Sequence, residues 1–416
     1  MKNDFEHSYS GPLTIKSGQN VGARGLAEPQ SIGQDSWDDS SSTARYALDM
    51  TGMCVDPSPP QSLIQGLAAP LGSPHRAADI MQPDKWICSQ EPLEPPSLWL
   101  LKEAHVMGGS ITGRTAEGQL GGQLILTKEH SLIPASYAVT DGEKELSVDH
   151  LIFKPDGIYL QPLPKAKYLS GIYFFIGAAN NHFGHTILEG VTRLWALDYL
   201  QEELRREIRF IVYENAHRQS TLDLLEHAGI PKEKIVSASP HDIIEKLIVP
   251  DAAMRSHRSI SAFQTNVWDT MASRIIAEKP SKKTFLSRRN ARDRPLQNHA
   301  KIEKSFTDHG YDIVVPEELS IREQIKLAKE SISLAGCVGS QMYLACFQQS
   351  GASNIVIAPR NFFLKDDILI SSAKGNSLEV IFGSKVDFRH PKNEMDWSVD
   401  IQLVELAIRS VNSQIS

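Results

Sequence analysis

A short segment with two histidines and a glutamate holds the residues of this chain best suited to proton transfer. His185 and Glu189 are four residues apart, so on a helix their side chains lie on one face. Asn181 and His182 stand just before them, and the apolar run Ile172–Ile176 is typical of a buried strand. Because open α/β folds bind ligands at the carboxyl ends of their strands, we predict an acid/base pair at such an edge.

Other interpretations of this segment stay open. A histidine beside an apolar helix is often structural, and His182, His185 and Glu189 could instead converge on a metal ion. Their spacing suits a metal less well than an H-E-x-x-H motif does, and no second ligand cluster is evident. Arg193 could pair with Glu189 or remain in solvent, and Trp195 is expected in the core.

A basic segment forms the second candidate. Residues 281–294 contain six basic residues and one acidic residue, a local charge of +5 in a chain of net charge −7. The segment follows the strand-like run Thr284–Leu286, and its Arg288, Arg289 and Arg292 are suited to contact with phosphate oxygens. We predict a diphosphate-binding loop, with a solvated basic loop as the alternative.

A glycine-containing turn forms the third candidate. In the segment Ala335–Met342 a strand ends, Gly336 and Gly339 permit a tight turn, and a helix begins. Backbone N–H groups at Gly339 and Ser340 would then suit a phosphate or ribose. The glycine spacing matches neither a dinucleotide-binding fingerprint nor a Walker loop, so the turn alone could be purely structural.

Strands and helices alternate regularly around these segments, which is typical of βαβ units with parallel sheets. The predicted strands are Leu98–Val106, Gly122–Leu126, Leu151–Phe153, Ile158–Leu160, Ile172–Ile176, Phe210–Tyr213, Lys246–Val249, Thr284–Ser287, Asp312–Val315, Ser331–Ala335 and Asn354–Ala358. The predicted helices are 183–206, Thr221–Ala228, Ser261–Ala277, Ala300–Asp308, Ser320–Glu330, Gln341–Gln348 and Val399–Val411. Two such blocks predict an α/β protein of two lobes with a cleft between them.

Composition divides the chain into four parts. Residues 1–97 hold 11 of the 23 prolines and show no persistent helix or strand period, so we predict a largely disordered arm. Residues 98–279 and residues 280–395 are predicted to form the two α/β lobes. The apolar stripe of the last segment, 396–416, predicts a helix that packs back across the lobes.

The bulk composition favours an enzyme or binding protein inside the cell. A net charge of −7 argues against general affinity for nucleic acid. The four cysteines lack zinc-site spacing and indicate reduced thiols, and no apolar run suggests a membrane span or signal peptide. We therefore predict a cytoplasmic protein and leave open its peripheral attachment to the inner face of a membrane; the oligomeric state stays undetermined.

The three segments, in this order, resemble glycosyltransferase family 61, which includes bacterial capsular-polysaccharide enzymes and eukaryotic xylosyl- and N-acetylglucosaminyltransferases. The resemblance covers roughly residues 98–390. The matching positions are Asn181, Phe183, Gly184, His185, Glu189, Arg193, Leu194 and Trp195, then Ser287, Arg288, Arg289 and Arg292, then Gly336, Gly339, Ser340 and Met342. Two departures stand out: His182 is inserted in the first motif, and Val338 occupies a position where the family usually has histidine.

The resemblance implies a GT-B architecture of two Rossmann-like lobes and an inverting, metal-independent transfer from a nucleotide sugar, without a cofactor, to a polysaccharide or glycolipid. In that scheme residues 98–279 form the acceptor-side lobe and residues 280–395 the nucleotide-sugar-binding lobe. His185 is the base and Glu189 orients it. The implied donor diphosphate ligands are Arg288, Arg289, Arg292, Gly339 and Ser340, and the other implied cleft residues are Asn181, His182, Arg193 and Gln341. Val338 motivates an alternative, a sugar- or nucleotide-binding relative that has lost turnover.

Overall fold

The computed structural model describes two compact units, residues 1–52 with 94–255 and residues 53–93 with 256–416. The described residues are 97–107, 124–128, 167–177, 183–213, 219–238, 242–255, 259–290, 293–360, 362–364, 366–386 and 396–415, with residues 32 and 133 and several short strands outside these ranges. Most of the predicted arm, residues 1–97, lies outside them, and so do Asn181, His182 and Arg292.

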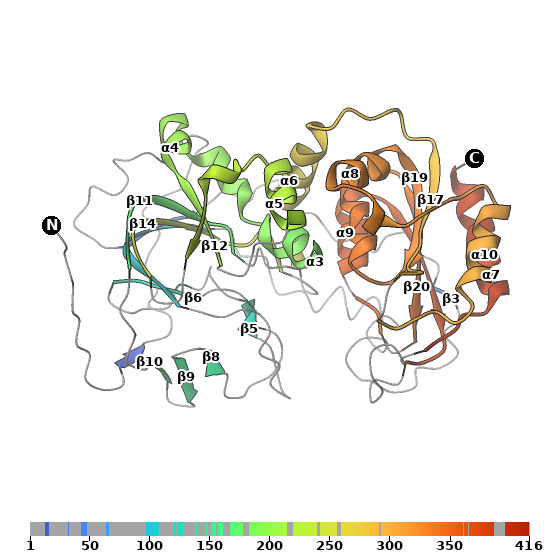
Figure 1. The fold of residues 1–416 in the computed structure, drawn as a ribbon, viewed down its shortest axis with the longest axis horizontal. Helices are drawn as coiled ribbons and strands as arrows, with labels where there is room; N and C mark the ends of the chain where they lie inside the picture. The colour runs from blue at the N-terminus through green and yellow to red at the C-terminus, as the bar shows by residue number, and fades with distance from the viewer. Residues whose placement is uncertain are drawn as a thin grey trace. The chain divides into compact units, whose positions relative to one another are not determined.

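The N-terminal unit is built on a mixed seven-stranded sheet with the order β13-β12-β11-β14-β4-β2, in which β6 also pairs with β4 (Figure 1). Strand β11 pairs in parallel with β12 and β14, whereas β4 pairs antiparallel with β14, β2 and β6. Its core packs Tyr173, Phe175 and Leu101 against Ile211 and Leu247. The strands are β2 (Thr43–Ala47), β4 (Ser97–Met107), β6 (Leu124–Leu126), β11 (Tyr168–Phe175), β12 (Arg209–Tyr213), β13 (Ile235–Ala238) and β14 (Ile243–Pro250).

Smaller elements complete this unit. A four-stranded antiparallel sheet has the order β1-β10-β9-β8, and its register Gly157↔Lys154 joins the two strands predicted at 151–153 and 158–160 in a hairpin. The remaining strands and helices are β1 (Leu13–Ile15), β5 (Leu120–Gly121), β7 (Ala138–Val139), β8 (Ser147–Val148), β9 (Leu151–Lys154), β10 (Gly157–Leu160), β15 (Met254–Arg255), α5 (Gln219–His227) and the 3-10 turn η5 (Lys232–Lys234).

The single helix predicted over residues 183–206 is wrong. In its place stand α3 (Phe183–His185), a π-helical turn η3 (Thr186–Gly190), a 3-10 helix η4 (Leu194–Tyr199) and α4 (Glu202–Glu207). Distant bonds account for the break: Thr192 Oγ1 accepts from the Met254 N–H at 2.7 Å, and Arg193 Nε donates to the Pro250 carbonyl at 3.1 Å. These contacts hold residues 191–193 out of a continuous helix.

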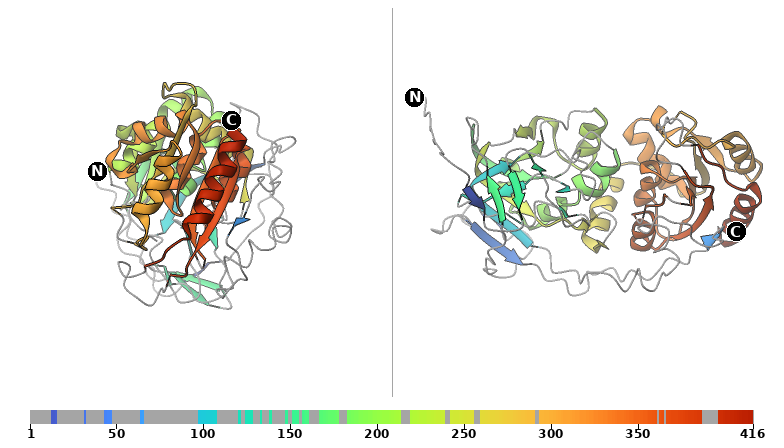
Figure 2. Two further views of the ribbon diagram at one scale, coloured as in Figure 1. Left: turned by 90° about the vertical axis from the view of Figure 1, so that its right-hand side faces the viewer. Right: turned by 90° about the horizontal axis from the view of Figure 1, so that it is seen from below.

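The C-terminal unit is a doubly wound α/β domain. Its six-stranded sheet has the order β18-β17-β19-β20-β21-β3, and every neighbouring pair is parallel. One sheet face carries α7 and α10, which lie side by side, and the other carries α8 and α9 (Figure 1, Figure 2). The strands are β3 (Ile64–Gln65), β16 (Ser259–Ile260), β17 (Lys282–Leu286), β18 (Asp312–Val314), β19 (Ser331–Cys337), β20 (Ser353–Pro359) and β21 (Ser377–Gly383). The helices are α6 (Ala262–Ser273), α7 (His299–Asp308), η6 (Pro316–Glu318), α8 (Ile321–Glu330), η7 (Ser340–Phe347), α9 (Asp366–Lys374) and α10 (Ile401–Ile415).

Local signals in the sequence account for much of this unit. Ser320 caps α8 through a capping box with Glu323, at the start of the helix predicted from Ser320. The apolar stripe of α10, which includes Val404 and Ile408, is buried in the core of its own unit. The structure also groups α6 with this unit, because α6 packs on α8, α9 and η7, so the units divide after residue 255 rather than after 279. Helices within the described residues all fall short of the length and apolar content of a membrane span.

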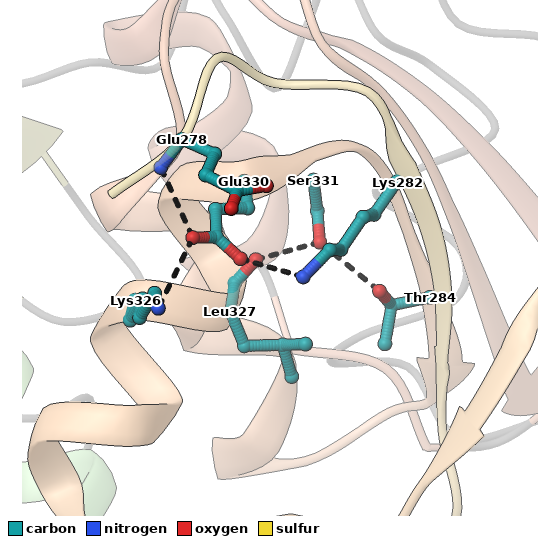
Figure 3. A network of polar contacts seen from close by, with 7 residues as sticks. All are labelled: Glu278, Lys282, Thr284, Lys326, Leu327, Glu330 and Ser331. Atoms are coloured by element: carbon teal, nitrogen blue, oxygen red, sulfur yellow. Dashed lines mark hydrogen bonds and ion pairs between the residues drawn. The ribbon is translucent and has the colours of Figure 1, made fainter.

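A buried carboxylate joins the segment before β17 to α8 (Figure 3). Glu330 is 3% exposed and accepts from the Glu278 N–H at 3.0 Å and from Lys282 Nζ at 2.7 Å, with Lys326 Nζ 3.7 Å away. Burial acts to raise the pKa of Glu330, but the bonds from Lys282 and the Glu278 N–H outweigh it and lower the pKa. The network fixes where β17 begins, and so the position of the arginine loop at its far end.

Candidate functional site

A pocket of about 110 Å³ opens where β17 and β19 of the C-terminal unit end. Its charged residues come from the basic segment, here called the arginine loop (residues 287–294), and from α7, and the turn after β19 adds Val338. Its lining includes Arg288, Arg289, Arg294, Glu303, Val338 and Trp397. The structure thus brings together two segments that the sequence singled out separately.

Arg288 ties the arginine loop to the turn after β19. Its Nη1 donates to the Val338 carbonyl at 2.9 Å, and its Nη2 donates to the Asp293 carbonyl at 3.1 Å. The turn leaves room for this guanidinium only because residue 339 is glycine: φ is +148°, and a Cβ there would lie 2.6 Å from Nη1. Gly339 therefore serves the position of Arg288 as well as the turn.

The other two arginines, Arg289 and Arg294, bring charge to the pocket without a carboxylate ion pair among the residues that the structure describes. The Arg294 guanidinium lies 4.0 Å from the Phe362 ring centroid. Burial, and secondarily the nearby Arg288 charge, lower the pKa of Arg294 to about 10. The acidic residue of the lining, Glu303, accepts a hydrogen bond from Ser287 Oγ. The pocket is therefore suited to an anion.

The turn after β19 is held by side-chain bonds to backbone. Gln341 Nε2 donates to the Leu286 carbonyl at 3.1 Å and to the Cys337 carbonyl at 3.2 Å, so Gln341 joins β17 to β19. The Val338 side chain is 2% exposed and lines the pocket. The predicted helix after the turn is the 3-10 helix η7, with Gly339 at its N-cap position and Ser340 as its first residue.

His185 and Glu189 meet in the N-terminal unit as predicted from their spacing. His185 Nδ1 lies 3.1 Å from Glu189 Oε1, and their side chains are 40% and 25% exposed. The pair spans the end of α3 and the π-helical turn η3. An imidazole held by a carboxylate through one nitrogen, and reachable by solvent, can take up a proton through the other.

Arg193 is buried, so the solvated side chain considered from the sequence is wrong. It is 6% exposed, donates through Nε to the Pro250 carbonyl, and places Nη1 3.5 Å from the carbonyl oxygen of Glu189. Its guanidinium lies 5.1 Å from the Phe175 ring centroid, and a Cβ on Gly177 would approach Nη1 to 2.3 Å. Arg193 thus packs the backbone of the loop after β11.

Arg294 and Trp397 are pocket residues that the sequence motifs did not predict as site residues. Arg294 belongs to the basic segment, whereas the predicted third arginine, Arg292, lies outside the described residues. Trp397 belongs to none of the sequence motifs and reaches the pocket from a distant part of the chain. Trp195, by contrast, lies in the core as expected at 3% exposed. The rival metal site stays untested because His182 is not among the described residues.

Comparison with known proteins agrees with the three motifs. The family model described as Glycosyltransferase 61 matches residues 183–356, which span the His185–Glu189 pair, the arginine loop and the turn after β19. Among curated proteins, none matches the chain. The match implies glycosyltransferase activity, with a sugar donor and an acceptor as its partners. Residues 183–356 are thus similar to glycosyltransferase family 61, and over these residues the resemblance drawn from the motifs is confirmed.

Proposed function

We propose that the protein is an inverting, metal-independent glycosyltransferase that binds the diphosphate of a nucleotide sugar in the pocket at the ends of β17 and β19. The observation that carries this proposal is the set Arg288, Arg289 and Arg294, which line one pocket without carboxylate partners among the described residues. Arginine N–H groups match phosphate oxygens, and a partly desolvated site strengthens the contact.

In the proposed reaction the acceptor hydroxyl oxygen forms a bond to the anomeric carbon as the bond from that carbon to the diphosphate oxygen breaks. The hydroxyl proton passes to His185. With Nδ1 donating to Glu189, Nε2 is the basic nitrogen, so Glu189 fixes the tautomer and orientation of the base. The arginines stabilise the charge that develops on the leaving diphosphate, and each such donor contributes about 3–4 kcal/mol in comparable sites.

The finer assignments follow from the resemblance. We propose a GT-B architecture, no cofactor, and a polysaccharide or glycolipid acceptor such as a capsular polysaccharide. A cytoplasmic protein, free or attached to the inner face of a membrane, would meet both nucleotide sugars and lipid-linked acceptors. Arg292, Asn181 and His182 remain proposed site residues, as do the backbone N–H groups of Gly339 and Ser340.

Incubation of the purified protein with a panel of nucleotide sugars and lipid-linked or free glycan acceptors tests the proposal. We expect release of nucleoside diphosphate that depends on acceptor and is lost in His185→Ala. The matched control is His309→Ala: this histidine bonds the Ser305 carbonyl through Nδ1 at 2.8 Å, at the end of α7. Failure of every nucleotide sugar to bind would refute the function.

One observation favours a second candidate, a donor-binding protein without turnover. Val338 places an apolar side chain in the pocket at the position where the family usually has histidine. This candidate predicts nucleotide-sugar binding without diphosphate release, and release after Val338→His. Turnover by the unaltered chain would eliminate it.

A further inference from the structure

The C-terminal segment 396–399 packs against the end of the arginine loop. Leu296 and Trp397 form a parallel β-bridge, in which the Gln297 N–H donates to the Trp397 carbonyl at 2.9 Å. Asn298 extends the contact, because its Nδ2 donates to the Val399 carbonyl at 2.8 Å. These bonds join two segments about a hundred residues apart, and the C-terminal one lies outside the family match of residues 183–356.

Trp397 adds a bond that acts on one residue of the pocket. Its indole Nε1 donates to the Arg294 carbonyl at 3.0 Å, and the ring, 3% exposed, lines the pocket. Arg294 has φ +52°, a left-handed conformation that non-glycine residues rarely adopt. A conformation of this kind persists when the surrounding structure enforces it. The indole bond is such an enforcing contact.

The backbone conformation at residue 294 decides where its side chain points. In this conformation the guanidinium lies over the Phe362 ring and lines the pocket beside Arg288. If the backbone of Arg294 adopted a right-handed helical or extended conformation, its Cβ and the whole side chain would point in another direction. Arg294 also forms no ion pair with a carboxylate among the described residues, and the Phe362 ring is the side chain against which its guanidinium packs.

We propose that Trp397 is a positioning residue for the donor site, which holds Arg294 in the left-handed conformation that directs its guanidinium at the diphosphate. This inference rests on the proposed function and extends the site to a segment beyond the family match. Trp397 acts through Arg294, so removal of its N–H weakens diphosphate binding only while Arg294 is present.

Calorimetric titration of the full chain with inorganic pyrophosphate tests this coupling. Trp397→Phe removes the indole N–H, and we expect pyrophosphate affinity to fall about three- to tenfold, the range for one net hydrogen bond. Arg294→Gln should weaken binding at least as much, and adding Trp397→Phe to it should cause no further loss. The matched control is Trp195→Phe, which loses an equal indole bond of 3.0 Å to the Asp251 carbonyl in the N-terminal unit and should leave affinity unchanged.

The outcomes separate the inference from the proposed function. If the unaltered chain binds neither pyrophosphate nor a nucleoside diphosphate, both fall. If the unaltered chain binds pyrophosphate and the Trp397→Phe variant binds it equally well, only the positioning role is overturned. The same holds if Trp397→Phe lowers the affinity of the Arg294→Gln variant as much as it lowers that of the unaltered chain. Should Trp397→Phe not fold, site-specific replacement of Trp397 by benzothienylalanine keeps the ring size without the N–H and must give the same loss.

Discussion

Gly339→Ala should damage the donor pocket through Arg288. The new Cβ would lie 2.6 Å from Arg288 Nη1, closer than carbon and nitrogen atoms can approach without displacement. Since Nη1 ends a long side chain, the guanidinium moves rather than the backbone. That movement breaks its bonds to the Val338 carbonyl at 2.9 Å and the Asp293 carbonyl at 3.1 Å. The substitution therefore acts on a charge that the proposed function needs.

Two contributions set the size of the effect on stability. An alanine at φ +148° adopts a conformation nearly restricted to glycine, which costs about 1–3 kcal/mol. Loss of the two Arg288 hydrogen bonds adds about 1 kcal/mol to this loss of stability, less than the two bonds together, because the half-buried guanidinium then forms hydrogen bonds to water instead. We expect urea denaturation to show a loss of about 2–4 kcal/mol in the free energy of unfolding, and pyrophosphate titration to show affinity reduced more than tenfold.

Gly351→Ala separates backbone strain from the displacement of Arg288. Gly351 has φ +89°, but nothing lies within 4 Å of the Cβ that alanine would add. We expect it to lose stability and keep its affinity for pyrophosphate. The reasoning is refuted if Gly339→Ala binds as tightly as the unaltered chain, or if it weakens binding equally in an Arg288→Ala background, where no guanidinium remains to displace.

Three further outcomes follow from the site and its support. His185→Ala should lower turnover about 10²–10⁴-fold with donor affinity unchanged, whereas Glu189→Gln should lower it less, as measured by diphosphate release. Glu330→Gln should lower the free energy of unfolding by about 1–2 kcal/mol at pH 7, discounted because both partner lysines are about half exposed. The pKa of Glu330 is lower in the folded protein than its ordinary value of 4.5, so the contribution of Glu330 to stability is complete above pH 4.5 and is lost as the pH falls through the folded pKa. The difference in unfolding free energy between the unaltered chain and Glu330→Gln should therefore be smaller at pH 3 than at pH 7. Finally, a chelator should leave turnover unchanged, and activity restored only by added metal would contradict the metal-independent scheme.

Where local chemistry decides the structure, the sequence was a sufficient guide. The α8 start follows from Ser320 and Glu323, which are three residues apart and cap the helix by themselves. The pairing of His185 with Glu189 follows from a spacing of four. The parallel C-terminal sheet follows from alternating apolar periods. In the first two cases the interacting residues lie within two helical turns of each other, and in the third the period within each strand and helix is itself local although the paired strands are distant in sequence.

Features set by distant contacts could not be predicted from the same patterns. The π-helical turn at Thr186–Gly190 depends on bonds from Thr192 and Arg193 to residues about sixty positions away. The helix period in the sequence carries no trace of those bonds. Likewise, the role of Trp397 depends on a contact with Arg294 across 103 positions. Arg292 and Arg294 are the same residue type in the same basic segment, so the sequence does not show which of them lines the pocket. The left-handed backbone that directs the Arg294 side chain arises only in the folded unit.

The way the arginine loop is held explains why the pocket keeps its charge. Arg288 is fixed by the carbonyls of Val338 and Asp293, and the carbonyl of Arg294 is fixed by Trp397. Backbone carbonyls orient a guanidinium without neutralising it, whereas carboxylates would orient it and cancel its charge. The two kinds of partner thus have opposite consequences for an anionic ligand. Because the carbonyl partners leave the charge of Arg288 in place, the way this loop is held favours the binding of a phosphate group.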